Sequence, residues 1–431
     1  MLASGRRLSV LFRETRPDLM LSREAARPRP DPDVPDGQDG GERPAGPWWR
    51  GAVLFGSVAA VLWVLSWVSV SHLSFSTTYP GERFLPHQPW LDGWARWDSG
   101  WYREIAENGY SLVTGRQSSV AFFPAYPVSM RVLGAVLGGP LQAGILLTLA
   151  AGLTVAVAAW TWFRRRLSPA AAWTALCLLL LYPYAFYLYG VVYADALFIA
   201  AVAGAFLLLD ADRPWLAGVV GALATAARPI GIVVVAALAV RAVERRGAIP
   251  WSPARFASAP AGSAGRAWWR DAGVLVAVAG LMGYCLYLSR RFGDPFAFAT
   301  VEEYWGQRPG PVTWLKLDFF KGITEFGDPT AWVAYVAHAV VTFAALAFVP
   351  RVFRRFGWGY GVYSLFVVGL AAFSTKDFFG LGRYVLAAFP CFAAAAEVLV
   401  DHPRMRTLAL VVSGVGLVTM TSFFARGSYL S

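Results

Sequence analysis

Long apolar stretches separated by short polar ones follow one another from residue 51 to the end of the chain. Many of them approach the roughly 20 residues that a helix needs to cross a bilayer. The pattern therefore predicts an all-α polytopic membrane protein with about eleven transmembrane helices, in a domain that covers residues 48–431. The expected helical segments are 51–71, 141–163, 170–188, 195–210, 215–227, 230–243, 272–289, 331–349, 358–374, 385–399 and 407–424.

Composition supports this interpretation and excludes a soluble domain. The 431 residues are 57% hydrophobic and 15% charged, and the mean hydropathy is +0.47. Residues 1–47 differ from the rest, because seven arginines precede a tract rich in Pro, Asp and Gly. We expect this segment to be a disordered cytoplasmic tail without a cleavable signal peptide.

The net charge of +11 is interpreted loop by loop as an orientation signal, because cytoplasmic loops of membrane proteins are enriched in Lys and Arg. The arginines of 164–166 and of 244–271 predict cytoplasmic loops. The loops expected outside are a large first one, 72–140, and then 292–330 and 375–384. The amino terminus is then cytoplasmic, and the charge gives no reason to expect a nucleic-acid partner.

The stretch from Arg96 to Tyr110 in the first external loop is dense in charge, aromatic residues and glycine. It predicts a short interfacial helix with Asp98 at its start. Asp98 can be an ordinary helix cap, or a general base whose pKa rises because Trp97 and Trp101 partly desolvate it. Arg96 and Arg103 are expected to oppose that rise, so the pattern leaves the net shift open. Glu104 and Glu107 are expected to lie on the solvated face of the helix.

Cations also lie among the apolar segments on the predicted external side. Arg228 stands in Ala227-Arg228-Pro229, where two short helices meet, and Lys376 and Arg383 share the third external segment. Such cations can snorkel to lipid headgroups, or together bind a phosphate. We favour the phosphate site. Asp195, at the entrance of a span, can be a helix cap or the partner of one of these arginines.

Metal and nucleotide chemistry have no support in the sequence. The three cysteines lie far apart inside apolar runs, and the four histidines show no ligand spacing. A Walker motif and a glycine-rich loop next to a strand are both missing from the sequence. We expect neither a metal nor a cofactor.

Several of these segments together resemble the PIG-V-type mannosyltransferase family in its bacterial branch. The first is Arg96-Trp97-Asp98-Ser99-Gly100-Trp101-Tyr102 and its continuation to Tyr110. The others, in family order, are Phe122–Pro127, Tyr193–Phe198, Ala227–Gly231, Gly293–Phe298 and Gly382–Pro390. The first motif is fairly specific and the others are individually weak. Asp195 departs from the usual Ser-Glu of its segment.

The resemblance implies a GT-C glycosyltransferase fold in the bacterial plasma membrane, with the active site on the external face. It implies a polyprenyl-phosphate sugar donor, with mannose the expected sugar, a glycolipid or glycan acceptor, and inversion at the transferred carbon. Asp98 matches the catalytic acid of the family's first loop. Arg228, Arg383 and Lys376 are expected to bind the donor phosphate. The residues expected to bind substrate or otherwise support the site are Arg96, Trp97, Trp101, Tyr102, Glu104, Asp195 and Tyr384.

Two other classes of function fit the same pattern less well. A transporter or flippase for an anionic lipid fits the half-helices around Arg228, but we find no internal repeat in the sequence. A non-catalytic scaffold that binds membrane lipids is the other alternative.

Overall fold

The computed structural model describes residues 47–75, 82–252, 268–307, 310–325 and 329–430, and this part of the chain is helical without a strand. The predicted tail lies outside it, except for Pro47. The α-helices are α1 (Trp49–His72), α2 (Pro89–Asp92), α3 (Ser99–Asn108), α4 (Ala125–Gly134), α5 (Pro140–Arg166), α6 (Pro169–Leu180), α7 (Asp195–Asp210), α8 (Pro214–Ala227), α9 (Ile232–Arg245), α10 (Trp268–Asp271), α11 (Ala279–Phe292), α12 (Ala297–Thr300), α13 (Pro311–Trp314), α14 (Leu317–Glu325), α15 (Pro329–Phe356), α16 (Trp358–Ser374), α17 (Leu381–Ala387), α18 (Phe389–Val400) and α19 (Pro403–Ala425).

Five helical segments among the described residues are long and apolar enough to cross a membrane. They are Trp49–His72, Pro140–Arg166, Trp269–Phe292, Tyr335–Phe356 and Pro403–Ala425. The bent pair α17 and α18 makes a sixth if it is one span, and α6, α8 and α16 are shorter apolar helices. The prediction of an all-α, multi-pass membrane protein is therefore confirmed, whereas the number of about eleven crossings stays a prediction.

Two expected spans are interrupted where a proline follows the helix. The segment 170–188 is helical only to Leu180 and continues as the 3₁₀ turn η2 (Ala185–Leu188) after Pro183. The segment 385–399 bends by 75° between α17 and α18, where Pro390 stands in the first turn of α18. Proline lacks an N–H donor and restricts the residue before it, so a helix ends more easily there than it continues. The prediction of one continuous helix was wrong in both places, whereas the number of crossings is not settled by these breaks.

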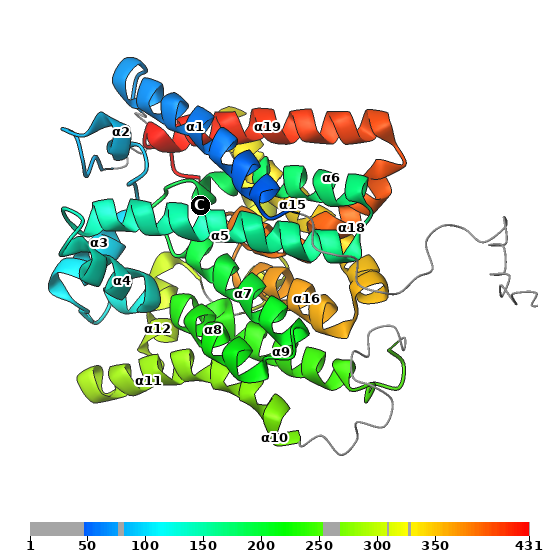
Figure 1. Cartoon of the computed structure of the whole chain (residues 1–431). Coiled ribbons are helices and arrows are strands. Elements are labelled where there is room, and N and C mark those ends of the chain that lie inside the picture. Colours follow the sequence, from blue (N-terminus) through cyan, green and yellow to red (C-terminus); the bar gives the residue numbers. More distant parts are fainter. Residues whose placement is uncertain (1–46, 76–81, 253–267, 308–309, 326–328, 431) are drawn as a thin grey trace, which may run out of the picture. The chain divides into compact units, whose positions relative to one another are not determined.

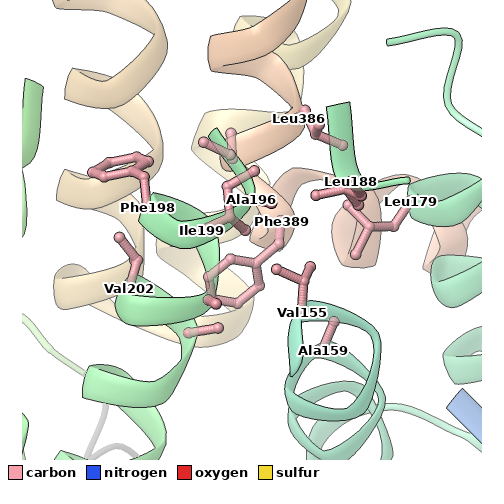
Figure 2. Close-up of a cluster of buried hydrophobic side chains, with 14 of the residues drawn as sticks. Val155, Ala159, Leu179, Leu188, Ala196, Phe198, Ile199, Val202, Leu386 and Phe389 are labelled. Atoms are coloured by element: carbon pink, nitrogen blue, oxygen red, sulfur yellow. The ribbon is translucent and has the colours of Figure 1, made fainter. Parts of the chain in front are cut away.

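Buried apolar side chains of α5, α7 and α18 pack against one another in the core. In Figure 2, Val155 and Ala159 of α5 lie near Phe389 of α18, next to Ile199 and Val202 of α7. These side chains are among the most deeply buried of the chain. Membrane helices gain much of their stability from such close packing, since lipid is as apolar as their own surfaces.

A buried ion network joins α5, α7, α9 and α16 at the arginine-rich ends of these helices. Asp210 accepts hydrogen bonds from Tyr360 Oη at 2.5 Å and Arg241 Nε at 3.0 Å, and it also pairs with Arg166. Glu244 accepts a hydrogen bond from Arg241 at 3.0 Å. Two cations and two anions balance each other here, so we interpret this network as a structural connection between helix ends.

The helices α2, α3, α4 and α12 gather at the opposite end of α5 (Figure 1, left). They belong to the predicted first and second external loops. The helix α3 packs against α4 and the beginning of α5, and the 3₁₀ turn η7 (Val301–Trp305), which follows α12, packs against η1 (Ser119–Ala121). This end of the molecule holds the motif residues.

Candidate functional site

The predicted motif helix is confirmed as α3, which begins at Ser99. Its buried face carries Tyr102 and Ile105, while Glu104 and Glu107 are exposed. Glu104 accepts a hydrogen bond from Asn108 at 3.0 Å, on the surface of the same helix. The helix is therefore amphipathic, and its burial fixes the position of Asp98 just before its first turn.

The Asp98 carboxylate does not cap α3, although Asp98 stands at the cap position. Its backbone lies in the right-handed helical region, and its side chain makes no capping hydrogen bond in the described part of the chain. Instead, Asp98 Oδ2 lies 3.5 Å from Arg383 Nη1, and the Asp98 N–H donates to Tyr193 Oη at 3.1 Å. Trp97, with a φ of 53°, turns the chain into this position. The interpretation of Asp98 as an ordinary helix cap is therefore wrong, because its side chain does not bond to the first turn of α3.

Four charged side chains meet at this point, and we call Asp98, Asp195, Arg228 and Arg383 the charge cluster. Arg228 forms an ion pair with Asp195 Oδ1, and Arg383 Nη1 lies 3.9 Å from Asp195 Oδ2. Asp195 is thus the partner of an arginine, whereas Ala194 holds the cap position of α7. The cluster joins residues that are up to 285 positions apart in the sequence.

Breaks between helices bring the two arginines into the cluster. Arg228 is extended, with a φ of −153°, between α8 and the 3₁₀ turn η3 (Pro229–Gly231). Arg383 lies in the first turn of α17, directly after Gly382, where a Cβ atom would come within 2.5 Å of the Tyr184 ring. A glycine at 382 is therefore required for this close approach, and it brings α17 near the chain before η2.

Aromatic rings hold both guanidinium groups in place. Arg228 lies over the Tyr384 ring at 4.6 Å, and Arg383 lies 5.4 Å from the Tyr193 ring centre. Such cation–π contacts favour a guanidinium that has lost part of its water. Tyr384 supports the site through this contact with Arg228.

The charge cluster is largely buried, but Asp98 stays accessible. The exposed fraction of the side chain is 24% for Asp98 and 16% for Arg383, against 3% for Asp195. Burial and the nearby charge of Asp195 raise the pKa of the Asp98 carboxyl above its ordinary value, although Arg383 and Arg228 oppose the rise. A carboxylate with a raised pKa is a stronger base.

The arginines that chiefly oppose this rise are Arg383 and Arg228, whereas the sequence-based expectation named the motif arginines Arg96 and Arg103, which pair with other acids. Arg96 is fully buried, and its Nη2 atom lies 3.0 Å from the Asp92 carboxylate, which is fully buried as well. Arg103 pairs with Glu107 at 3.0 Å on the exposed face of α3. Arg96 thus supports the loop before Asp98 from inside.

Arg383 also has an unused hydrogen-bond donor. Its Nε atom is buried and has no hydrogen-bond partner among the described residues. A buried donor without a partner is rare and costs about 1–3 kcal/mol, so this atom favours the binding of an acceptor such as a phosphate oxygen.

Sequence reasoning missed one acid near the cluster, Glu302 of η7. Burial and the charge of Asp98 raise the pKa of Glu302 to about 7, and Arg228 and Arg383 act in the opposite direction. The available signal was an acidic pair, Glu302-Glu303, next to Tyr304-Trp305 in a predicted external loop. That signal did not indicate which loop returns to Asp98.

Motif aromatics connect α3 to η7. Trp101 stacks on Phe122 at 5.8 Å and contacts Trp305 edge-on at 5.9 Å. Tyr102 packs edge-on against Phe122 at 5.2 Å. Trp101 and Tyr102 therefore help to hold α3, which follows Asp98, against η7, which contains Glu302.

Lys376 forms no ion pair with the charge cluster among the described residues. Its backbone N–H donates to Gln307 Oε1 at 2.9 Å, and its ammonium group lies next to Gly306. The assignment of Lys376 to the same phosphate site as Arg383 stays a prediction.

The described residues offer no group of three or more His, Cys, Asp and Glu side chains that could hold a metal ion.

His338 is buried next to α17, where its Nδ1 atom accepts a hydrogen bond from the Gly382 N–H at 3.2 Å. This contact fixes the beginning of α17 near Arg383.

Comparisons with known proteins give a weak likeness to one group of solved structures. No family model matches the chain, and no curated protein matches it. The oligosaccharyltransferase of Archaeoglobus fulgidus in the apo form is similar over 87% of this chain, with 13% identity and a TM-score of 0.46. Its complex with an inhibitory peptide and a dolichol-phosphate is similar over 89%, also with 13% identity, and the TM-score is 0.42. The chain spans about half the length of these proteins, covering 56% and 57% of them.

Proposed function

We propose that this protein is an integral membrane glycosyltransferase with a GT-C-type arrangement. It transfers a sugar, with mannose the expected one, from a polyprenyl-phosphate donor to a glycolipid or glycan acceptor. The observation that carries the proposal is the partly exposed Asp98 carboxylate, 3.5 Å from an arginine whose Nε has no partner among the described residues. A displacement in which a phosphate leaves needs a base and a hydrogen-bond donor to the anionic phosphate, and Asp98 and Arg383 offer these two groups side by side.

The proposed reaction is a single inverting displacement. Asp98 takes the proton of the acceptor hydroxyl group, and the acceptor oxygen forms a bond to the anomeric carbon of the sugar. On the opposite side the bond between that carbon and the phosphate oxygen breaks, and the polyprenyl phosphate leaves with the electron pair. Arginines that contact the phosphate stabilise the negative charge that develops on it.

The two arginines of the charge cluster are expected to have different roles in binding the donor phosphate. Arg228 is committed to Asp195, so its charge is already partly balanced. Arg383 keeps longer contacts, 3.5 Å to Asp98 and 3.9 Å to Asp195, and its Nε is free to donate among the described residues. We therefore assign the main phosphate contact to Arg383, with Arg228 as the second cation. Lys376 remains a further candidate for the same phosphate.

Donor turnover tests the function directly. Purified protein in lipid nanodiscs, given radiolabelled polyprenyl-phosphate mannose and a glycolipid extract, is expected to release polyprenyl phosphate and label an acceptor. The same protein in sealed liposomes serves to measure movement of the donor across the bilayer. Movement of the donor across the bilayer without any sugar transfer would contradict the glycosyltransferase function and favour the alternative of a transporter or flippase.

The proposed orientation places the charge cluster at the outer face of the bacterial plasma membrane. Thr114, exposed in the first loop, is expected outside, whereas Asp401, exposed between α18 and α19 beside Arg404 and Arg406, is expected on the arginine-rich cytoplasmic side. After replacement of the three natural cysteines by alanine, Thr114→Cys should react with an impermeant maleimide in intact cells. Asp401→Cys should react only after permeabilisation. The reverse pattern would overturn the orientation.

A further inference from the structure

The segment that follows α19, residues 426–430, lies against the candidate site. Trp97 Nε1 donates a hydrogen bond to the Ser428 carbonyl at 3.2 Å. The Leu430 carbonyl lies 3.2 Å from His338 Nε2, and the Leu430 side chain is buried. This segment is therefore fixed at two points, one next to Asp98 and one next to α17.

Hydrogen bonding fixes the tautomer of His338. Because Nδ1 accepts the Gly382 N–H, the ring proton is on Nε2, which donates to the Leu430 carbonyl. One histidine thus joins the segment after α19 to the residue that precedes Arg383. The position of this segment is coupled to the charge cluster by direct contacts.

Three rings from separate parts of the chain form a continuous row, which we call the aromatic row: Trp97, Tyr429 and Phe379. The ring centres of Trp97 and Tyr429 are 4.7 Å apart, and those of Tyr429 and Phe379 are 5.4 Å apart. Tyr429, in the middle, is 43% exposed. The two outer rings are half-buried, so the row presents an accessible aromatic surface.

The aromatic row adjoins the proposed base. Trp97 directly precedes Asp98 in the sequence. Partial burial and the charge of Asp98 raise the pKa of Tyr429 to about 12, which indicates that the phenol lies within electrostatic reach of the carboxylate. Arg383 acts on the same phenol in the opposite direction. The row therefore has an apolar surface that begins at Trp97, the residue before Asp98, and a hydroxyl group at its middle, on Tyr429.

We propose that the aromatic row is the subsite for the sugar ring of the acceptor, with Tyr429 as its central positioning residue. This inference rests on the proposed function and names the chemistry of its acceptor. A pyranose ring has one face made of C–H groups, which stacks on an aromatic ring, and hydroxyl groups at its edge, which bond to polar partners. The row next to Asp98 offers both.

Position relative to the base favours the acceptor over the lipid tail of the donor. The attacking hydroxyl group must reach the base within about 2.6–3.2 Å, so the acceptor has to lie beside Asp98. A polyprenyl chain needs apolar surface but no neighbouring carboxylate or phenol. An acceptor sugar stacked on the row between Tyr429 and Trp97, the residue before Asp98, lies on the side of the base, and its departing proton goes to Asp98.

Saturation-transfer NMR with methyl α-D-mannopyranoside as the probe tests the subsite on protein in nanodiscs. We expect signals from the C–H face of the probe in the natural protein and a loss of most of this signal in Tyr429→Ala. Tyr429→Phe keeps the ring and should keep the stacking signals. Tyr287→Ala is the matched control, because Tyr287 is an aromatic residue of similar exposure, 40%, on α11.

A transfer assay with the same probe as acceptor separates this inference from the proposed function. Tyr429→Ala is expected to raise the acceptor KM at least tenfold, whereas the donor KM stays within twofold. Transfer that depends on Asp98 with an acceptor KM unchanged by Tyr429→Ala would overturn the subsite and leave the function intact. Probe signals that Tyr429→Ala removes, in a protein without transfer, would instead overturn only the function. Signals that Tyr429→Ala leaves unchanged would contradict the subsite.

Discussion

Asp98→Asn is expected to lower the rate of sugar transfer by about a hundred- to ten-thousand-fold, the usual contribution of a general base. Asparagine keeps the shape of aspartate but cannot take the proton of the acceptor hydroxyl group. The substitution should not disturb α3, because the Asp98 side chain makes no capping hydrogen bond in the described structure. The Asp98 N–H can still donate to Tyr193. The measurement is single-turnover transfer from radiolabelled polyprenyl-phosphate mannose.

Glu107→Gln serves as the matched control. Glu107 is an exposed acid on the same helix, and its partner is Arg103. Its substitution is expected to leave transfer within twofold of the natural rate. Affinity for the donor should not fall in Asp98→Asn, because the substitution removes a negative charge next to Arg383. Near-natural transfer by purified, folded Asp98→Asn would falsify the assignment of Asp98 as the base.

The pH dependence of the natural enzyme offers a second test of the base. The reaction needs the ionised carboxylate, so kcat/KM should rise with pH as Asp98 loses its proton. Because the pKa of Asp98 is raised, this rise should occur above the ordinary aspartate value of about 3.9. A rate that stays constant through that range down to pH 4 would contradict a raised pKa.

The helices that cross the bilayer could be predicted from the sequence because their signal is local. An apolar run such as 51–71 or 407–424 needs no knowledge of its neighbours, and both are helical in the structure. The breaks were harder to predict, since membrane helices can accommodate a proline when neighbouring groups satisfy the backbone. The outcome after Pro183 and at Pro390 depends on tertiary packing, which hydropathy does not report.

The charge cluster could be predicted in part. Isolated charges at the ends of apolar runs need partners, and this reasoning left two alternatives for Asp195, of which the structure shows the pairing with an arginine. It could not distinguish Arg383 from Lys376, which are seven positions apart but have different surroundings. It also missed Glu302 and Tyr429, since their approach to Asp98 depends on how distant segments return to the site.

Arg383→Ala is expected to weaken the binding of polyprenyl phosphate by about 10- to 150-fold. The substitution removes a charge-assisted contact worth about 1.5–3 kcal/mol, and each 1.4 kcal/mol corresponds to a tenfold change in Kd. The variant should still fold, because Asp195 keeps its ion pair with Arg228. Arg383→Lys keeps the charge but loses the geometry of the guanidinium, so we expect it to restore only part of the affinity.

Binding of polyprenyl phosphate without a sugar, titrated into protein in nanodiscs, isolates the contact of Arg383 with the phosphate from the chemical step. Arg103→Ala is the control, because Arg103 is a half-buried arginine whose charge pairs with Glu107 on the surface of α3. Its Kd should equal that of the natural protein. A rise in Kd for Arg383→Ala, partial recovery for Arg383→Lys and no change for Arg103→Ala would together assign the phosphate to Arg383. An unchanged Kd for Arg383→Ala would remove Arg383 from the donor site, and Arg228 would then be the cation to test.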